Sequence, residues 1–245
     1  MVHEYPLIFM STRRGDIETI LSLLQQGVLV DTRGGAFDRT SLFEAVVRKN
    51  VTATRLLLQY GASVKLVDSA GWTALHAAAI HDSRECCKIL LEHGSNVFTE
   101  RPGGATPLDW GALNDNTEVL RMMFTSMVDM SATRTQHKTW VVTRMLVDSI
   151  QAGHVGTATL LVEEGADIDY IREDGCTMMD IALRRKNTAI IYMLKEARLH
   201  RDKCEAFALG NIARVGDGSL ISPQDVEVVD MILKLYAKSN VGVIE

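Results

Sequence analysis

The chain has 245 residues and a formal net charge of −5 at pH 7, with 47% hydrophobic and 23% charged residues. This composition is typical of a globular protein that buries a core, and the 6% aromatic content and 4 prolines favour helices over a β-sandwich. The acidic balance argues against a dedicated nucleic-acid binder, because such proteins usually carry an excess of Lys and Arg.

The amino terminus, "MVHEYPLIFMSTRRGD", has no basic leader followed by a long apolar run, so it does not predict a secretion signal. No stretch reaches the roughly 18 uncharged apolar residues that a membrane-spanning helix needs. The four cysteines, Cys86, Cys87, Cys176 and Cys204, form no CxxC pair and no regular framework. These features predict a reducing cytoplasmic setting, with the nucleus or the cytoskeleton as alternatives.

A regular period runs through the chain. Thr40 opens "TSLF", Thr73 opens "TALH" and Thr106 opens "TPLD", so the interval between successive threonines is the same both times. Gly61 in "YGASV" and Gly94 in "HGSNV" repeat at that interval as well. Self-similarity at a fixed period is typical of repeat architectures, in which each unit stacks on its neighbours.

The segment before the first threonine matches only part of this unit. "RRGDIETILSLLQQGVLV" resembles the second half of a unit, with Gly27 as the residue that ends its helix. It lacks the threonine that opens the later units. The stretch "DTRGGAFD" then adds extra residues before the unit that starts near Gly35.

The unit at residues 68–100 predicts two short helices. Thr73 can cap the first helix through its hydroxyl, and the alanines that follow allow a close approach to a neighbouring helix. Cys86, Ile89 and Leu90 form an apolar stripe at helical spacing, which predicts the second helix. Gly94 supplies the left-handed residue that ends it. One such hairpin cannot bury its own apolar face, so its neighbours must stack on it.

The period becomes irregular near residues 125–140. "MFTSMVDMSATRTQHKTWVV" lacks the glycine expected after a second helix and adds several residues, so we expect the stack to bend or open there. Two further units are expected near Thr139 and Arg172. Gly165 would end the second helix of one of these units, and Thr177 would begin the first helix of the last unit.

The tail, residues 204–245, does not repeat. "SPQD" predicts a helix start, because Ser222 can cap it and Pro223 suits its first position. An apolar stripe follows at Val226, Val229, Ile232, Leu233 and Tyr236. We therefore expect a repeat domain over residues 1–203, followed by either a cap on the last repeat or a segment that docks a second protein.

The stretches "DSAGWTALHAAA", "GGATPLDWGA", "LLLQYGASV" and "LLVEEGADI" resemble ankyrin repeats, whose signature joins a T-P-L-H-type helix start to a G-A-type helix end. The resemblance covers roughly residues 5–198. It implies an all-α solenoid of five to six stacked units with β-turn tips, in which first helices line a concave groove. It also implies a protein-binding module that is not an enzyme.

The residues that could carry chemistry favour structural roles. None of the familiar zinc spacings is present, and Cys86 and Cys87 stand where the family usually has small apolar core residues. His76 is expected to hydrogen-bond the neighbouring turn. The stretch "GDGS" lacks the lysine of a phosphate-binding loop, and no G-x-S-x-G motif occurs. We therefore expect no catalytic residue, no cofactor and no metal.

Two patterns nominate partner-binding residues. Some candidates lie at the turn tips, where an exposed Trp72 would be an anchor for a partner, although it could instead pack along the adjacent turn. Others are basic residues that close the first helices, and they form either a solvated edge or a discontinuous cationic rim that attracts an acidic segment. The candidates are Phe37, Arg39, Arg48, Trp72, His81, Arg101, Trp110, Arg172, Arg184 and Arg185.

The sequence thus predicts a module that binds a protein partner through its groove and turn tips, with no nucleic acid or membrane as partner. The oligomeric state stays open. One alternative is a structural subunit of a large cytoskeletal or ciliary assembly. Another is a substrate-recognition adaptor of the ubiquitin-ligase type, although the tail lacks the Leu-Cys-Arg start of suppressor-of-cytokine-signalling boxes.

Overall fold

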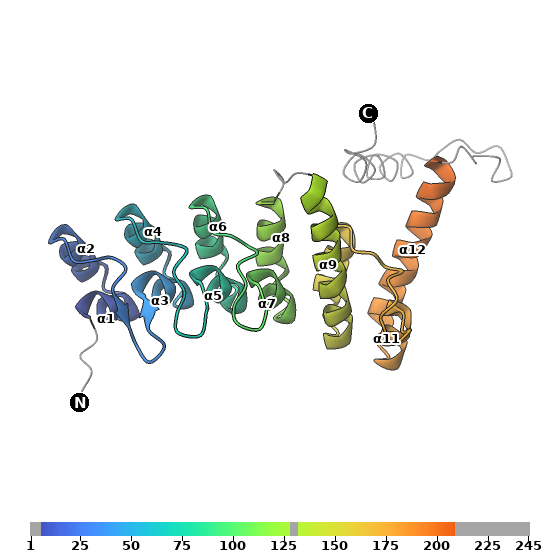
Figure 1. The fold of residues 1–245 in the computed structure, drawn as a ribbon, viewed down its shortest axis with the longest axis horizontal. Coiled ribbons are helices and arrows are strands. Elements are labelled where there is room, and N and C mark those ends of the chain that lie inside the picture. Colours follow the sequence, from blue (N-terminus) through green and yellow to red (C-terminus); the bar gives the residue numbers. More distant parts are fainter. Residues whose placement is uncertain (1–5, 128–131, 209–245) are drawn as a thin grey trace. The chain divides into compact units, whose positions relative to one another are not determined.

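The structure, a computed structural model, describes residues 6–127 and 132–208 and is mostly helical (Figure 1). This confirms the predicted fold class. The helices are α1 Leu7–Arg14, α2 Ile17–Gln25, α3 Ser41–Val47, α4 Val51–Gln59, α5 Ala74–His81, α6 Arg84–Glu92, α7 Pro107–Leu113, α8 Thr117–Thr125, α9 Ala132–Ala152, α10 Val155–Glu163, α11 Met178–Arg184 and α12 Thr188–Ala208. Two short strands, β1 Arg33–Gly34 and β2 Arg39–Thr40, pair antiparallel in the described part of the chain.

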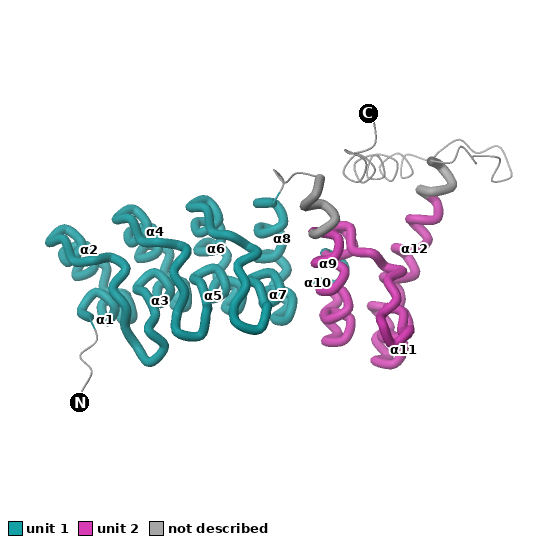
Figure 2. Tube along the Cα trace, viewed as in Figure 1, with its two compact units in different colours: residues 1–129, 156–160 teal, residues 130–155, 161–245 magenta. Residues whose placement is uncertain are grey.

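The chain divides into two compact units (Figure 2). Unit 1 comprises residues 1–129 and 156–160, and unit 2 comprises residues 130–155 and 161–245. The division falls in the irregular stretch that follows α8, where the sequence lacks a helix-ending glycine. The expected bend of the stack at this stretch stays a prediction.

Unit 1 contains four helix pairs, α1–α2, α3–α4, α5–α6 and α7–α8. Figure 1 shows α1, α3, α5 and α7 in one row and the second helices in another, and each helix contacts the next helix of its row. The sequence indicated only half a unit before Gly27, and the structure supplies α1 as its first helix. Equivalent core positions recur once per period and are at most 5% exposed: Leu24, Leu57, Leu90 and Met123.

The repeated threonines begin the first helices, as the sequence predicted. The Thr40 hydroxyl accepts a hydrogen bond from the Phe43 backbone N–H at 3.2 Å. Thr73 and Thr106 each form a capping box, in which the residue three positions later also accepts from the threonine backbone N–H. A cap of this kind stabilises a helix by about 1 kcal/mol, so these residues fix where each first helix starts.

The repeated glycines end the second helices, also as predicted. Gly27, Gly61 and Gly94 follow α2, α4 and α6 with φ angles of 82°, 84° and 78°. This left-handed conformation favours glycine because a Cβ atom would clash with the backbone. After α8, the position one period beyond Gly94 is occupied by Met127, so this helix lacks the glycine.

The turns that connect the pairs form three projections in unit 1, here called finger 1 (residues 33–40), finger 2 (67–73) and finger 3 (101–106). They lie on the side of the first-helix row (Figure 1). Neighbouring fingers contact one another directly. The Ser69 backbone N–H donates to the Phe37 carbonyl at 2.9 Å, and Arg33 Nη1 donates to the Val67 carbonyl at 2.7 Å. Finger 1 is therefore hydrogen-bonded to finger 2.

Unit 2 is less regular than the sequence suggested. Thr139 was expected near the start of a unit, but it lies inside α9, a helix of 21 residues. The later signals hold: Gly165 has a φ of 93°, and the Thr177 hydroxyl accepts from the Asp180 backbone N–H at 3.1 Å. The helix α12 continues past residue 203 to Ala208. The apolar stripe at 226–236 lies outside the described residues.

Candidate functional site

The sequence-predicted site residues fall in both units. Seven of them lie in the fingers, in the first helices or directly after a first helix of unit 1, and Arg172, Arg184 and Arg185 belong to unit 2. The seven in unit 1 are Phe37, Arg39, Arg48, Trp72, His81, Arg101 and Trp110.

An ion pair joins finger 1 to finger 2. Arg39 Nε lies 3.3 Å from Asp68 Oδ2, and the Asp68 side chain is only 1% exposed. The other Asp68 oxygen accepts backbone hydrogen bonds from Ala70 at 2.9 Å and from Trp72 at 3.0 Å. Asp68 therefore holds finger 2 in shape and neutralises the cation of finger 1.

The Arg39 guanidinium also lies between two aromatic rings. Its central carbon is 4.6 Å from the Phe43 ring centroid and 4.9 Å from the Phe37 ring centroid, which is cation–π geometry. Phe37 itself is 53% exposed at the tip of finger 1. This ring is an exposed apolar group that a partner can contact.

The next junction carries different residues at the same positions. Trp72 lies one period after Arg39, and Arg101 lies one period after Asp68. The Arg101 guanidinium lies 4.4 Å from the Trp72 ring centroid and 5.8 Å from that of Trp110. The two indoles contact each other with centroids 4.8 Å apart. Trp72, Arg101 and Trp110 are hereafter the aromatic–arginine cluster.

Trp72 is half-buried within this cluster. It packs along finger 3 and meets the His76 ring edge-on at 5.6 Å, so the structure supports the second of the two alternatives drawn from the sequence. Gly71 lies so close to finger 3 that an added Cβ would stand 2.3 Å from Pro102 Cδ. Fingers 2 and 3 are therefore in close contact beside the indole.

Two nitrogen atoms of the aromatic–arginine cluster lack acceptors. Arg101 Nε and Trp110 Nε1 are buried and form no hydrogen bond with any described residue. Over the same described residues, no carboxylate lies within ion-pair distance of Arg101, in contrast to Arg39. The cluster thus combines a cation and two indole rings with hydrogen-bond donors that the described chain does not satisfy.

His76 fixes the helix beneath the cluster. Its ring is fully buried, Nδ1 accepts from the Thr73 backbone N–H at 3.1 Å, and Nε2 faces the Ala105 carbonyl at 3.4 Å. The predicted hydrogen bond to the neighbouring turn is therefore present. Burial lowers the pKa of His76 below its ordinary 6.5, and the positive charge of Arg101 lowers this pKa further. The imidazole is neutral at pH 7, so Arg101 remains the cation at this place.

The predicted basic edge of unit 1 is partly neutralised. The Glu44 carboxylate is 7% exposed, and its Oε1 lies 3.0 Å from Arg48 Nε and 3.9 Å from Arg13 Nε. Burial lowers the pKa of His81, and the charges of Lys49 and Arg39 lower it further. The sequence reasoning missed Glu44, because its carboxylate reaches residues of two different helix pairs.

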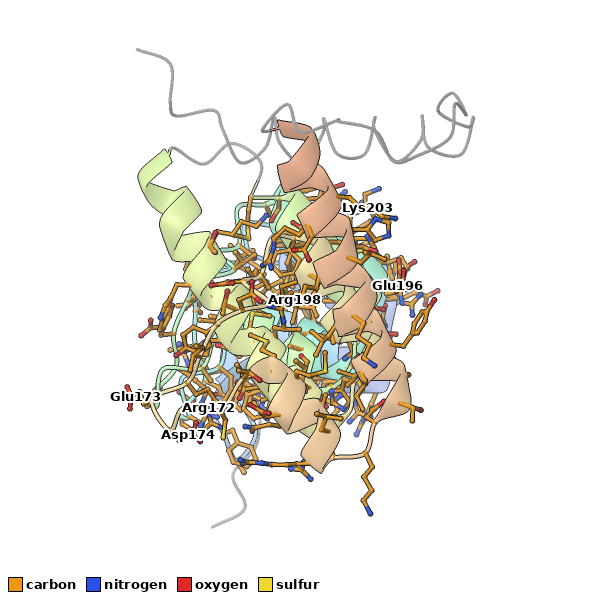
Figure 3. The ribbon with its side chains drawn as sticks, turned by 90° about the vertical axis from the view of Figure 1, so that its right-hand side faces the viewer. Arg172, Glu173, Asp174, Glu196, Arg198 and Lys203 are labelled. Carbon is orange, nitrogen blue, oxygen red and sulfur yellow. The ribbon has the colours of Figure 1, made fainter. Side chains whose placement is uncertain are left out.

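The candidates of unit 2 include no counterpart of the aromatic–arginine cluster. Arg172 Nη2 lies 3.6 Å from Asp174 Oδ2 in the finger at 171–177, and Arg184 and Arg185 are exposed at the end of α11. Figure 3 shows Arg172 and Asp174 set apart from the charged residues labelled on α12. A binding role for these three arginines stays a prediction.

The cysteines of unit 1 are core residues, as expected. Cys86 is 1% exposed and Cys87 is fully buried, and burial raises the pKa of Cys87 to about 12. Such a thiol is not a nucleophile at neutral pH. Among the described residues, no group of three or more His, Cys, Asp and Glu side chains is placed to hold a metal ion. None of the described helices combines the length and the apolar character needed to cross a membrane.

Comparisons with known proteins match this architecture. A family model described as "Ankyrin repeats (3 copies)" matches residues 64–134. "Palmitoyltransferase ZDHHC13" from Homo sapiens is 29% identical over 207 residues, which cover 79% of this chain and 32% of that protein. The chain thus spans about a third of the length of this relative. The activity in this name belongs to that protein.

"Notch-regulated ankyrin repeat-containing protein" from Xenopus laevis is 30% identical over 82 residues, which cover 32% of this chain and 72% of that protein. Among solved structures, the human ASB11 ankyrin repeat domain has a TM-score of 0.62 and 23% identity, covering 78% of this chain and 83% of that one. The latter likeness shows the fold alone.

Ankyrin repeats are protein–protein interaction modules, and the fold typically contributes binding rather than catalysis. The regular sequence period, the threonine-capped helix pairs and the matches to known repeats agree with one another. The chain belongs to the ankyrin-repeat family.

Proposed function

We propose that unit 1 binds a protein partner through its fingers and first helices, with the aromatic–arginine cluster at the centre of the contact. The observation that carries this proposal is the stacking of Arg101 on Trp72 beside Trp110. Trp and Arg are the residue types most enriched where truncation weakens a protein interface most. The exposed Phe37 ring extends the same surface to finger 1.

The surface is held rigid before a partner arrives. One backbone hydrogen bond and the Arg33 side chain join finger 1 to finger 2, and the Arg39–Asp68 pair reinforces them. Pro102 packs against Gly71 between fingers 2 and 3. Side chains that are already ordered lose little conformational entropy on binding, so more of the contact energy appears as affinity.

Partner capture from cell extract, followed by cross-linking and mass spectrometry, tests this proposal. We expect Trp110→Ala and Arg101→Ala to reduce capture, while circular dichroism confirms that both variants are folded. The matched control is Trp140→Ala, which removes an indole that is 56% exposed on α9 of unit 2. Undiminished capture by both folded unit 1 variants would refute the surface.

The setting of this module is proposed as cytoplasmic, and its use as a transient recognition module. Cys86, Cys87 and Cys176 are free thiols, which suits a reducing compartment. Two other uses are distinguishable by experiment. A permanent structural subunit would elute from size exclusion of native extract only within a large complex. An adaptor would keep its client after residues 204–245 are removed and would lose a second protein.

A further inference from the structure

We infer that the aromatic–arginine cluster binds a carboxylate of the partner, the side chain of an Asp or Glu in an extended segment. The inference rests on the proposed function and names the group that this surface recognises. Arg101 supplies the charge, and the indoles of Trp72 and Trp110 supply the adjoining apolar surface.

The repeat itself shows what is missing at this place. At the junction of fingers 1 and 2, the cation of Arg39 is neutralised by the buried carboxylate of Asp68 at 3.3 Å. At the junction of fingers 2 and 3, the position of that carboxylate is taken by Arg101, and an indole takes the place of the arginine. The first junction therefore contains an ion pair, whereas the cation of the second forms no ion pair with any described carboxylate.

The accessible donors of Arg101 point to the same ligand. Its Nε is buried, whereas its two Nη groups are not buried and form no hydrogen bond with any described residue. These Nη groups are therefore the donors that a partner's acceptor can reach. A carboxylate accepts several hydrogen bonds at once and matches the planar fork of a guanidinium.

The surrounding charges favour a monoanion over a dianion. Two carboxylates lie in the neighbouring turns: Asp68 is paired with Arg39, and Asp109 accepts from the backbone and the hydroxyl of Thr106. Their negative charge opposes a dianion more strongly than a monoanion. His76 is buried with a lowered pKa and adds no positive charge at pH 7. A phosphate dianion is usually held by a cluster of cations, whereas one guanidinium balances one carboxylate.

The aromatic rings favour a protein segment as the source of that carboxylate. The indole pair offers a surface to the methylene groups of Asp or Glu and to the residues beside them, while the guanidinium pairs with the acid. The formal net charge of −5 also weakens the attraction of the whole chain for nucleic acid. The partner is therefore an acidic segment with apolar neighbours.

The experiment selects a library of random peptides for binding to the full chain and then measures each selected peptide by indole fluorescence. Trp140→Phe is used as the background, because it removes the exposed indole of unit 2 and leaves Trp72 and Trp110 as reporters. Each peptide is measured with its acid and with Gln in that place, against the background chain and against Arg101→Gln. A double-mutant cycle then isolates the coupling between the peptide acid and Arg101.

We expect the selected peptides to share an acid at one fixed position. Replacing that acid by Gln should weaken binding about tenfold or more in the background chain and only slightly in Arg101→Gln, because coupling between close charge pairs at interfaces reaches this size. Arg101→Lys, which keeps the charge without the planar fork, should fall between the two. Circular dichroism confirms that the variants are folded.

The other outcomes separate the inference from the proposed function. Peptides that bind and change the indole fluorescence without a shared acid, or with an acid whose effect is the same in Arg101→Gln, would overturn the inference and leave the proposed surface in place. An oligothymidylate is measured in the same fluorescence assay. If it binds more tightly than every selected peptide, the inference is overturned as well. No peptide binding, together with unchanged partner capture by the unit 1 variants, would refute both.

Discussion

Arg101 lies 4.4 Å above the ring of Trp72, at the two positions that the preceding junction fills with the ion pair between Arg39 and Asp68. The repeat therefore keeps its backbone and changes its charge. In the first junction, the buried Asp68 carboxylate accepts from the turn of finger 2 and also pairs with Arg39. The second junction has Pro102 in place of Ser69 and keeps a cation and two indoles available to a partner.

Asp68 should be important for stability. Asp68→Ala leaves two finger N–H groups and Arg39 without their acceptor, and we expect the free energy of unfolding to fall by about 2–3 kcal/mol. Asp174→Ala is the control, because the side chain of Asp174 is 48% exposed in the finger of unit 2 and accepts from one backbone N–H, that of Cys176. Urea unfolding measures both changes. Equal losses for the two variants would contradict this role for Asp68.

Gly71 should tolerate no side chain. Gly71→Ala adds a methyl group that would stand 2.3 Å from Pro102 Cδ, in a backbone conformation with a φ of +81°. Gly94 is a matched control, since its φ is +78° and an added Cβ would meet nothing within 4 Å. We expect Gly94→Ala to cost about 1–2 kcal/mol from backbone strain alone, and Gly71→Ala to cost about 1–3 kcal/mol more from the clash. Similar losses of stability for the two variants in thermal unfolding would mean that fingers 2 and 3 are not in close contact at Gly71 and Pro102.

Stability should decrease on acidification because of His76. The folded-state pKa of this buried histidine is below its ordinary 6.5, so the unfolded chain takes up the proton first as the pH falls. The contribution is complete above pH 6.5 and is lost as the pH drops through the lower, folded-state value. We expect unfolding free energies measured between about pH 7.5 and pH 5.5 to fall less steeply in His76→Gln than in the natural chain. Identical slopes would show that His76 is not the responsible group.

The carboxy-terminal residues should act as a cap on unit 2. Leu183 is 53% exposed at the end of α11, whereas the equivalent Val46 and Ala79 of unit 1 are fully buried, in helices that contact the next first helix. We propose that the tail covers this open face, and we expect removal of residues 209–245 to lower the free energy of unfolding by about 1–3 kcal/mol. Unchanged stability together with the loss of one bound protein would identify a docking segment instead.

The sequence predicts the local parts of this fold well, because their causes are local. A threonine hydroxyl caps the helix that starts beside it, and a glycine ends the helix just before it, so Thr73 and Gly94 could be assigned without a structure. The long helix α9 could not be predicted in this way, because Thr139 is of a residue type that often starts a helix but lies inside this one. Whether a threonine caps or continues a helix depends on packing that the sequence does not display.

The candidate site was predictable in its members and not in its contacts. Trp72, Arg101 and Trp110 were each nominated separately, but their association requires knowing that the residue before one capping threonine faces the start of the next finger. That rule becomes visible once Arg39 and Asp68 are seen together. The replacement of an aspartate by an arginine one period later was the available signal in the sequence.

The affinity of the captured partner for Arg101→Asp tests the central claim most directly. An aspartate at position 101 gives finger 3 the residue that finger 2 has at Asp68, whose side chain accepts from two backbone N–H groups. We therefore expect the unfolding free energy to change by less than about 1 kcal/mol. The same substitution replaces the cation by an anion, and we expect partner affinity to fall at least about tenfold. Unchanged affinity in this stable variant would contradict the account.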